Sequence, residues 1–427
     1  MVAFCFLFLF FISMNAIIRN PLILPVFIPT FLLRLGSGLL VPILPLYAKS
    51  FDISYGLVGL VLAAEGIGHL VGDLPAAMVL NRIGRKSAML LGVITVALCG
   101  AGLFFAPSIS VIFLLRFVGG IGGALWDISR YAYLADATAV HQRGRALSVF
   151  GGISRIGTFL GPVIGGYIAS ATSVKYPFLV YGGISLLSAV VAAIAVEASR
   201  KRVSPSQHGL ARHFANIFRA HSKNLITAGT GQLFAQTIRS GRYIIIPLYG
   251  AEVLDLGYEQ IGLIMTASGF IDMMMFYPAG VIMDRFGRKF ANVPSFALQA
   301  IGMALIPLTE PFAPHLNLPF FFIGFITGEF IALLFAASLL GFGNGLSSGA
   351  MMTLGADLAP RDALSEFLGL WRLIGDGGRM SGPVCVGYVA DLLGLSPAAL
   401  AIAGIGLSAA GIFLFLVPET LEKRIDE

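Results

Sequence analysis

Charged side chains that interrupt long apolar stretches are the residues of this chain best suited to chemistry. The arginines are Arg34, Arg116, Arg130, Arg155, Arg239, Arg242, Arg372 and Arg379, and the acids are Glu65, Asp73, Asp127, Asp272, Glu329 and Asp376. A charge at the centre of a bilayer costs about 2.5 to 3.5 kcal/mol on insertion scales, so such side chains face a cavity or a partner. This pattern predicts a polar interior that binds or moves a polar species.

Proton transfer is one chemistry that the acids could perform. Glu65, His69 and Asp73 follow one another at intervals of four residues, which places three titratable groups on one helix face. A coupling acid must gain a proton when it is desolvated and lose it when an arginine approaches. His69 would relay a proton or serve as an ordinary hydrogen-bonded histidine. The candidate acids are Asp127, Glu65 and Asp73, followed by Asp272 and Asp376.

The elements that position these groups are predicted to be membrane-spanning helices. Apolar residues make up 57% of the chain and charged residues 12%, against roughly a quarter charged in soluble domains. The apolar runs are continuous, and a helical span needs about 20 such residues. We therefore predict an all-α polytopic membrane protein with twelve spans. In the first half they cover about 21–47, 57–80, 88–106, 109–137, 146–170 and 177–197. In the second half the first three begin near 224, 259 and 291, the fourth ends near 358, the fifth begins near 363 and the last covers 397–417.

The chain is a tandem duplication. The stretch from Asn81 to Lys86 repeats from Asp284 to Lys289, at an offset of 203 residues. A second repeat, from Gly161 to Tyr167, recurs from Gly382 at an offset of 221. Two pseudo-symmetric six-helix halves, 21–197 and 224–417, are predicted, with 18 extra residues between 308 and 332.

Basic residues are distributed unevenly between the two sets of loops. Eighteen lie in one set and in the terminal segments, whereas the other set holds two, Lys49 and Lys175. This asymmetry predicts that the first set, with both ends of the bundle, is cytoplasmic. We expect a plasma (inner) membrane location, and the basic pI reflects topology, with no nucleic-acid partner.

Three flanking segments complete the organisation. Residues 1–20 are predicted to be an apolar N-terminal extension, and 418–427 a cytoplasmic tail. The linker 198–223 holds six basic residues, three histidines and no acid, and is either an amphipathic helix on the inner leaflet or a solvated connection. Three cysteines within apolar segments predict no disulfide framework, metal or cofactor.

Four motifs together resemble the major facilitator superfamily over residues 21–420. The charged repeat, Gly280-x-x-x-Asp284-Arg285-x-Gly287-Arg288-Lys289, is similar to the family's loop between helices 2 and 3 of each half. Arg116-Phe117-x-x-Gly120-x-Gly122 resembles the helix 4 motif of proton-coupled members, and Pro42-Ile43-Leu44-Pro45 resembles the helix 1 motif of drug exporters. Gly157-x-x-x-Gly161-Pro162-x-x-Gly165-Gly166 resembles the helix 5 motif associated with antiporters. Ala77, Asn81 and Ser148 depart from these patterns.

The resemblance implies roles for several groups of residues. The loop residues would hold one conformation closed; they are Asn81, Arg82, Gly84, Arg85, Gly280, Asp284, Arg285, Gly287 and Arg288. The helix 5 glycines would pack another helix closely and seal a leak; with the proline they are Gly157, Gly161, Pro162, Gly165 and Gly166. Since helix 2 meets helix 11 and helix 5 meets helix 8 in this family, we expect the helix 2 acids to pair with Arg372 or Arg379, and Asp272 with Arg155. The pairs would form in one access state only, or else be static.

The prediction for function is a secondary active transporter working by alternating access. Proton-coupled efflux of amphipathic small molecules is the first hypothesis. The excess of arginines over acids supports an alternative, a carrier for an organic anion or a phosphorylated or lipid-like metabolite, and a non-transporting sensor is a further alternative. No enzyme motif occurs; we expect small-molecule, proton and lipid partners and a monomer. The predicted pathway residues are Arg34, Glu65, His69, Asp73, Arg116, Asp127, Arg130, Arg155, Arg239, Asp272, Asn344, Arg372, Asp376 and Arg379.

Overall fold

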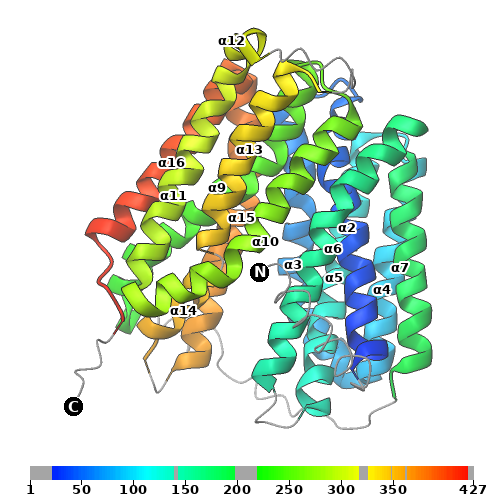
Figure 1. The fold of residues 1–427 in the computed structure, drawn as a ribbon. Coiled ribbons are helices and arrows are strands. Elements are labelled where there is room, and N and C mark those ends of the chain that lie inside the picture. Colours follow the sequence, from blue (N-terminus) through cyan, green and yellow to red (C-terminus); the bar gives the residue numbers. More distant parts are fainter. Residues whose placement is uncertain are drawn as a thin grey trace, which may run out of the picture.

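The computed structural model describes residues 22–138, 143–197, 219–316, 326–347, 349–360 and 363–421. Over these residues the chain is almost entirely helical and contains no strand, which confirms the predicted all-α class (Figure 1). The predicted N-terminal extension, the amphipathic stretch of the linker with His208 and His213, most of the tail and part of the 308–332 insertion lie outside the described residues.

The helices follow the two-half plan. In the first half they are η1 (Ile23–Phe27), α2 (Ile28–Lys49), α3 (Tyr55–Ile83), α4 (Arg85–Gly102), η2 (Leu103–Phe105), α5 (Ile109–Ala137), α6 (Arg143–Ala171) and α7 (Tyr176–Ala195). In the second they are α9 (Ser222–Glu252), α10 (Tyr258–Phe286), α11 (Arg288–Leu305), η4 (Ile306–Leu308), α12 (Thr309–Phe312), η5 (Ala313–Leu316), α13 (Gly328–Leu346), α14 (Ala350–Leu358), α15 (Leu364–Leu393) and α16 (Leu395–Phe415).

The two charged repeats are single-glycine joints, which corrects the predicted loops. Gly84 and Gly287 each separate two helices and adopt φ values of 81° and 115°. Glycine reaches this left-handed region without steric cost, so one residue suffices to reverse the chain. Asn81 and Asp284 therefore lie in the last turn of α3 and α10, while Arg85 and Arg288 begin the next helices.

The span predicted to end near 358 is broken into α13 and α14. The break follows the run Gly341-Phe342-Gly343-Asn344-Gly345, in which each glycine lowers helix stability by about 1 kcal/mol relative to alanine. Gly341 and Gly345 pack against the α10 backbone at Ser268 and Asp272. The run thus allows close packing of this broken helix on α10.

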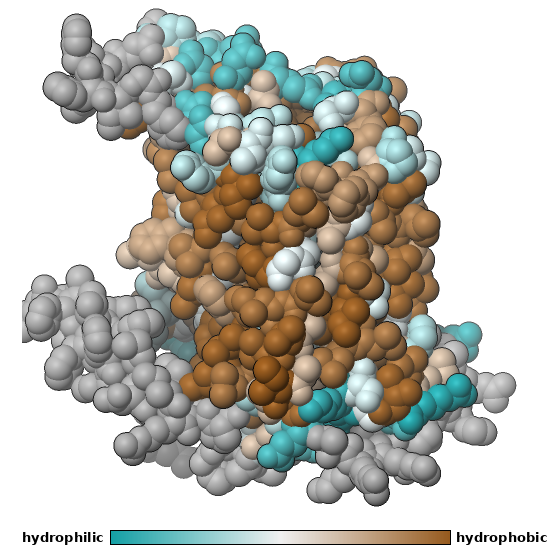
Figure 2. All heavy atoms as spheres, turned by 90° about the vertical axis from the view of Figure 1, so that its right-hand side faces the viewer, coloured by the Kyte–Doolittle hydropathy of each residue, from teal (hydrophilic) through white to brown (hydrophobic). Residues whose placement is uncertain are grey.

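A broad apolar surface covers one face of the bundle. Figure 2 shows one face as a hydrophobic band between hydrophilic ends, on the side where α4 and α7 lie in Figure 1. Leu98 of α4 and Ile194 of α7 are largely exposed. A contiguous exposed apolar surface marks a contact with a membrane or with another protein. In the described part of the chain, nine helices are long and apolar enough to cross a bilayer.

Two crossings join the halves. Helix α6 packs on α2 within its own half and on α10 across the interface, and α15 packs correspondingly on α9 and α3. A Cβ atom at Gly161 would collide with Gly38 of α2, and one at Gly166 with the backbone of Tyr258 on α10. The predicted close-packing role of these glycines is thus visible in the contacts of α6.

Among the described residues, the halves meet tightly at one end. Backbone N–H groups of Tyr55 and Gly56 donate to the carboxylate of Asp391 at 2.6 and 2.8 Å, and Gly59 packs on Pro383. These contacts lie at the end that carries the turns after α2 and α9. Toward the opposite end, where α14 lies, the two halves diverge (Figure 1).

Candidate substrate and proton pathway

A cavity of about 480 Å³ lies between the two halves. Helices α2 and α6 contribute one wall, and α9, α10, α13 and α15 the other. Its charged lining residues are Arg34, Arg155, Arg242, Arg379 and Asp272, and its large apolar and aromatic ones are Val41, Phe150, Phe159, Tyr243, Ile246, Met265 and Met273. The cavity is therefore amphipathic and strongly basic.

Asp272 is the centre of the polar contacts in this cavity. Its Oδ2 accepts a hydrogen bond from Asn344 Nδ2 at 2.6 Å and lies 3.6 Å from Arg242 Nη2. Its Oδ1 lies 3.8 Å from Arg155 Nη1, across the boundary between the halves. The expected pair of Asp272 with Arg155 is thus formed in this conformation; a switching role for it stays a prediction.

Arg242 is a cavity residue that the predicted pathway omitted. Its side chain is 7% exposed, and Nη2 donates to the hydroxyl of Tyr243 at 2.8 Å. Nε and Nη1 are buried and have no hydrogen-bond partner among the described residues. The only sequence signal was its place among the arginines of the apolar segments, three residues after Arg239.

Arg239, which was predicted to line the pathway, is not among the cavity-lining residues. It is buried behind the wall and donates from Nη2 to the hydroxyl and the carbonyl oxygen of Ser347. Since Ser347 caps the end of α13, this arginine ties α9 to the break between α13 and α14. Its role in the structure is to hold a helix junction.

A second charged cluster lies in the first half. Asp127 Oδ1 lies 2.7 Å from Arg130 Nη2, and its Oδ2 lies 3.5 Å from His69 Nε2 and 4.0 Å from Arg34 Nη2. Arg130 was expected to face the cavity but is 1% exposed, and its guanidinium lies 4.4 Å from the ring centre of Phe150. The cavity reaches this cluster through Arg34.

The acids of α3 and the arginines of α15 do not pair in this conformation. Glu65 forms an ion pair with Arg116, and Asp73 makes no ion pair with any other described residue. Arg372 and Arg379 lie 3.6 and 3.8 Å from Asp376 of their own helix. The expected bridge between α3 and α15 is therefore absent from this state of the molecule, as far as it is described.

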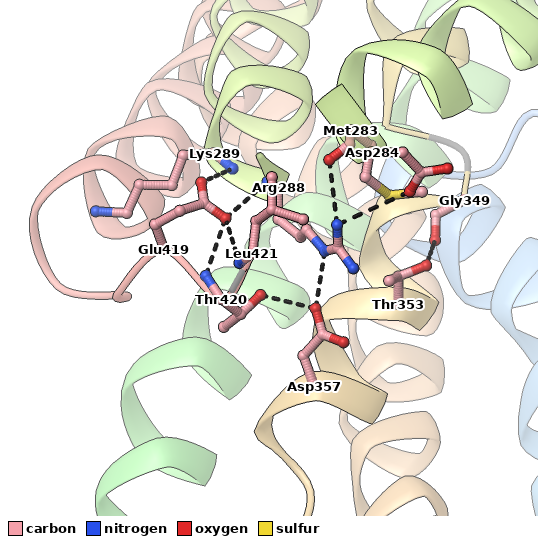
Figure 3. Close-up of polar contacts among 10 residues, drawn as sticks. All are labelled: Met283, Asp284, Arg288, Lys289, Gly349, Thr353, Asp357, Glu419, Thr420 and Leu421. Carbon is pink, nitrogen blue, oxygen red and sulfur yellow. Dashed lines mark hydrogen bonds and ion pairs between the residues drawn. The ribbon is translucent and has the colours of Figure 1, made fainter. Parts of the chain in front are cut away.

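The joints at Gly84 and Gly287 carry matching ion pairs. Arg85 pairs with Asp136, and Arg288 Nε donates to Asp357 Oδ2 at 2.8 Å. The two acids are 221 residues apart, so they are repeat equivalents. Arg288 also lies 3.8 Å from Asp284 (Figure 3). Each joint is thus fastened to the helix preceding α6 or α15.

The other residues of the charged repeat make few contacts. Arg82 and Arg285 are exposed, and Asn81 is partly buried. A Cβ atom at Gly280 would meet nothing within 4 Å. Packing therefore does not explain why glycine stands at 280, and Ala77 fits the same place in the first copy without strain.

The second joint has a fastening that the sequence did not predict. Glu419, just beyond α16, accepts hydrogen bonds from the backbone N–H groups of Arg288 and Lys289 at 2.9 and 3.0 Å (Figure 3). Thr420 Oγ1 donates to Asp357 at 2.8 Å. Partial burial raises the pKa of Glu419, but its backbone N–H donors outweigh that effect and hold the pKa below the ordinary value.

Comparison with known proteins decides the family. The model of the Major Facilitator Superfamily matches residues 26–331. The chain belongs to the Major Facilitator Superfamily. Solved structures agree in fold: a POT family transporter has a TM-score of 0.77 at 14% identity, over 95% of this chain and 97% of that one. A D-xylose-proton symporter has a TM-score of 0.73 at 16% identity, over 92% of this chain and 97% of that one.

Curated relatives of this superfamily member include drug resistance proteins. The quinolone resistance protein NorA of Staphylococcus aureus is 22% identical over 96% of this chain and 99% of its own length. Multidrug resistance protein 2 of Bacillus subtilis is 28% identical over 40% of this chain and 42% of its own length. An uncharacterized MFS-type transporter of Methanocaldococcus jannaschii is 20% identical over 87% and 92%. The superfamily member is thus an integral, multi-pass membrane transporter of small molecules.

Proposed function

We propose that this protein is a secondary active transporter that works by alternating access and exports amphipathic small molecules in exchange for protons. The observation that carries the proposal is the cavity between two halves that are joined at one end and diverge at the other. A site of this kind becomes accessible from either side when the halves rock. The names of the drug resistance relatives support the direction of transport.

Twelve spans are part of the proposal. Helices α6, α9 and α15 are 29, 31 and 30 residues long, but their charged and small residues keep them outside the nine apolar candidates. About 20 residues suffice to cross a bilayer, and each of these helices packs beside apolar spans. Polar faces on these three helices fit a lining around a pathway, with domains at 21–197 and 224–417.

The proposed membrane orientation follows from the side of the bundle on which the basic residues are concentrated. The joints at Gly84 and Gly287 lie at the end where the halves diverge, and the turns after α2 and α9 lie at the joined end. With the basic side placed in the cytoplasm of the plasma membrane, the structure is an inward-open state of a monomer.

Proton coupling is assigned to carboxylates that touch arginines within the spans. Asp127 and Asp272 each contact two or more cationic or titratable partners, so a change of those contacts would change proton affinity. Asp272 also lines the cavity, where a substrate could compete for Arg155 and Arg242.

The test is transport in liposomes that hold the purified protein and a pH-sensitive dye. Under an imposed pH gradient, addition of a transported substrate should drive proton movement, and Asp272→Asn should lower coupled transport at least tenfold. Lys223→Gln is the matched control, because it removes an exposed charge away from the cavity. Substrate movement that ignores the pH gradient would refute proton coupling, and no movement of any cationic, neutral or anionic substrate would refute transport.

A further inference from the structure

We propose that the substrate is an amphipathic organic anion, and that Arg242 and Arg155 bind its anionic group while Phe159 and Met265 contact its apolar body. The inference rests on the proposed transport function and specifies the ligand of the same cavity. It commits to a water-soluble molecule, not a bilayer lipid, with a compact carboxylate or phosphate attached to an aromatic or aliphatic body.

The charge of the cavity lining is the first argument. Four arginines and one aspartate line the cavity over the described residues. A cationic ligand would meet an excess of positive charge in a partly desolvated space, where Coulomb interactions are stronger than in water. An anion reduces that excess, so the lining selects for negative charge.

Unused hydrogen-bond donors are the second argument. Arg242 is one of the residues that line the cavity, and its Nε and Nη1 are buried without a hydrogen-bond partner among the described residues. A buried charged donor without an acceptor is destabilising. A guanidinium presents its N–H donors as a planar fork, and this fork matches the oxygens of a carboxylate or phosphate.

Asp272 leaves room for such a ligand. Its distances of 3.6 Å to Arg242 and 3.8 Å to Arg155 exceed the 2.7 to 2.9 Å typical of charge-assisted hydrogen bonds. Its short hydrogen bond among the described residues comes from Asn344, at 2.6 Å. A ligand anion can therefore bind the arginines while Asn344 continues to hold the aspartate.

The apolar wall is the third argument. Phe159 and Met265 border the same space, together with Ile246 and Phe150. Ligand sites of 300 to 1,000 Å³ commonly combine an apolar wall with a few polar groups that fix orientation, and this cavity is about 480 Å³. A small anion without an apolar body would leave this wall unfilled.

The test compares three probes that share one ring system: 2-naphthoate, 2-naphthamide and 2-naphthylmethylammonium. Isothermal titration of the purified protein in detergent should show naphthoate binding at least tenfold more tightly than the neutral amide, with no binding of the cation. Equal affinities, or tighter binding of the cation, would overturn the proposal.

Two variants locate the binding. Arg242→Gln should weaken naphthoate binding at least tenfold and leave amide binding within twofold, whereas Lys223→Gln should change neither. Unchanged naphthoate binding to a folded Arg242→Gln variant would overturn the assignment. Arg155→Gln, with the same expectation, answers the question if Arg242→Gln does not fold.

Two further arms separate alternative outcomes. Naphthoate binding abolished by phosphatidylglycerol in the micelles would mean that a lipid headgroup occupies the site, which overturns the proposal; binding that persists supports it. Transport of a cation driven by a pH gradient without naphthoate binding would leave the transport function intact and sink the anion site. Naphthoate binding in a protein that transports nothing would support the anion site and refute the transport function.

Discussion

At the scale of single residues, the two copies of the charged repeat differ in the charge of their first residue. Asp284 lies 3.8 Å from Arg288 and its side chain is 73% exposed, whereas its equivalent, Asn81, carries no charge. Exposed ion pairs contribute about 0 to 1 kcal/mol, so this contact adds little to the stability of the present conformation. Asp284 becomes important only if the halves close on it.

We therefore expect Asp284→Asn to impair transport more than Asn81→Asp does, because only the former removes a charge from the closing surface. Thermal stability of Asp284→Asn should stay close to that of the wild type. Initial rates in liposomes and melting temperatures of both variants test this. The opposite order of transport rates would refute it.

At the scale of secondary-structure elements, helix ends in this molecule are stabilised by acidic side chains from other segments of the chain. Glu419 accepts hydrogen bonds from the N-terminus of α11, where a negative charge is also favoured by the helix dipole. Because folding lowers the pKa of Glu419, its contribution to stability is present above the ordinary carboxyl pKa. It is lost as the pH falls through the lowered value.

Glu419→Gln should therefore lower the melting temperature by a few degrees at neutral pH and not in acid below the lowered pKa of Glu419. The amide keeps an acceptor oxygen but loses the charge. Melting curves of the wild type and the variant over a pH series should converge at the acidic end. A difference that is constant across pH would contradict this account of the cap.

At the scale of the whole molecule, the joined end is asymmetric. Asp391 of α15 caps the N-terminus of α3 in the opposite half, and the hydroxyl of Tyr55 donates to Glu252. The repeat equivalent of Asp391, 221 residues earlier, is the uncharged and exposed Ser170. One crossing of the halves thus carries a charged latch at this position and the other does not.

Asp391→Ala should shift the population toward a state open at the currently joined end, because replacing a capping side chain by alanine removes about 0.5 to 2 kcal/mol. Spin labels at the exposed positions Lys175 and Glu310, in a background without native cysteines, would report longer distances. The matched control is Ser170→Ala, which makes the same truncation at the equivalent position and leaves the latch intact. An unchanged distance distribution in Asp391→Ala would rule out the latch.

Much of this architecture could be predicted from the sequence because the duplication repeats both helix lengths and charges. The repeat identified Arg85 and Arg288 as equivalents, and both form the same ion pair. Charge in apolar segments identified Asp272 and Arg155, which meet across the interface. These features depend on local spacing or on large penalties for buried charge.

Other features depend on rotation about a helix axis, which spacing does not determine. Arg239 and Arg242 lie on one helix, yet one points behind the wall and the other into the cavity. Glu419 is distant in sequence from the helix that it caps, so no local pattern indicated the contact. The pairing of Arg372 and Arg379 with Asp376 depends on the conformation of the whole molecule.

The single-glycine joints have a mechanical consequence. Helix α3 forms the interface with α15 and α10 that with α6, while α4 and α11 continue from them after one residue each. Each joint is one residue long and is held by an ion pair of Arg85 or Arg288. The two helices that it connects therefore cannot tilt independently of each other. In the proposed rocking of the halves, the bilayer-facing helices must therefore tilt as well, and the hydrophobic thickness of the membrane would influence the balance between the two proposed states.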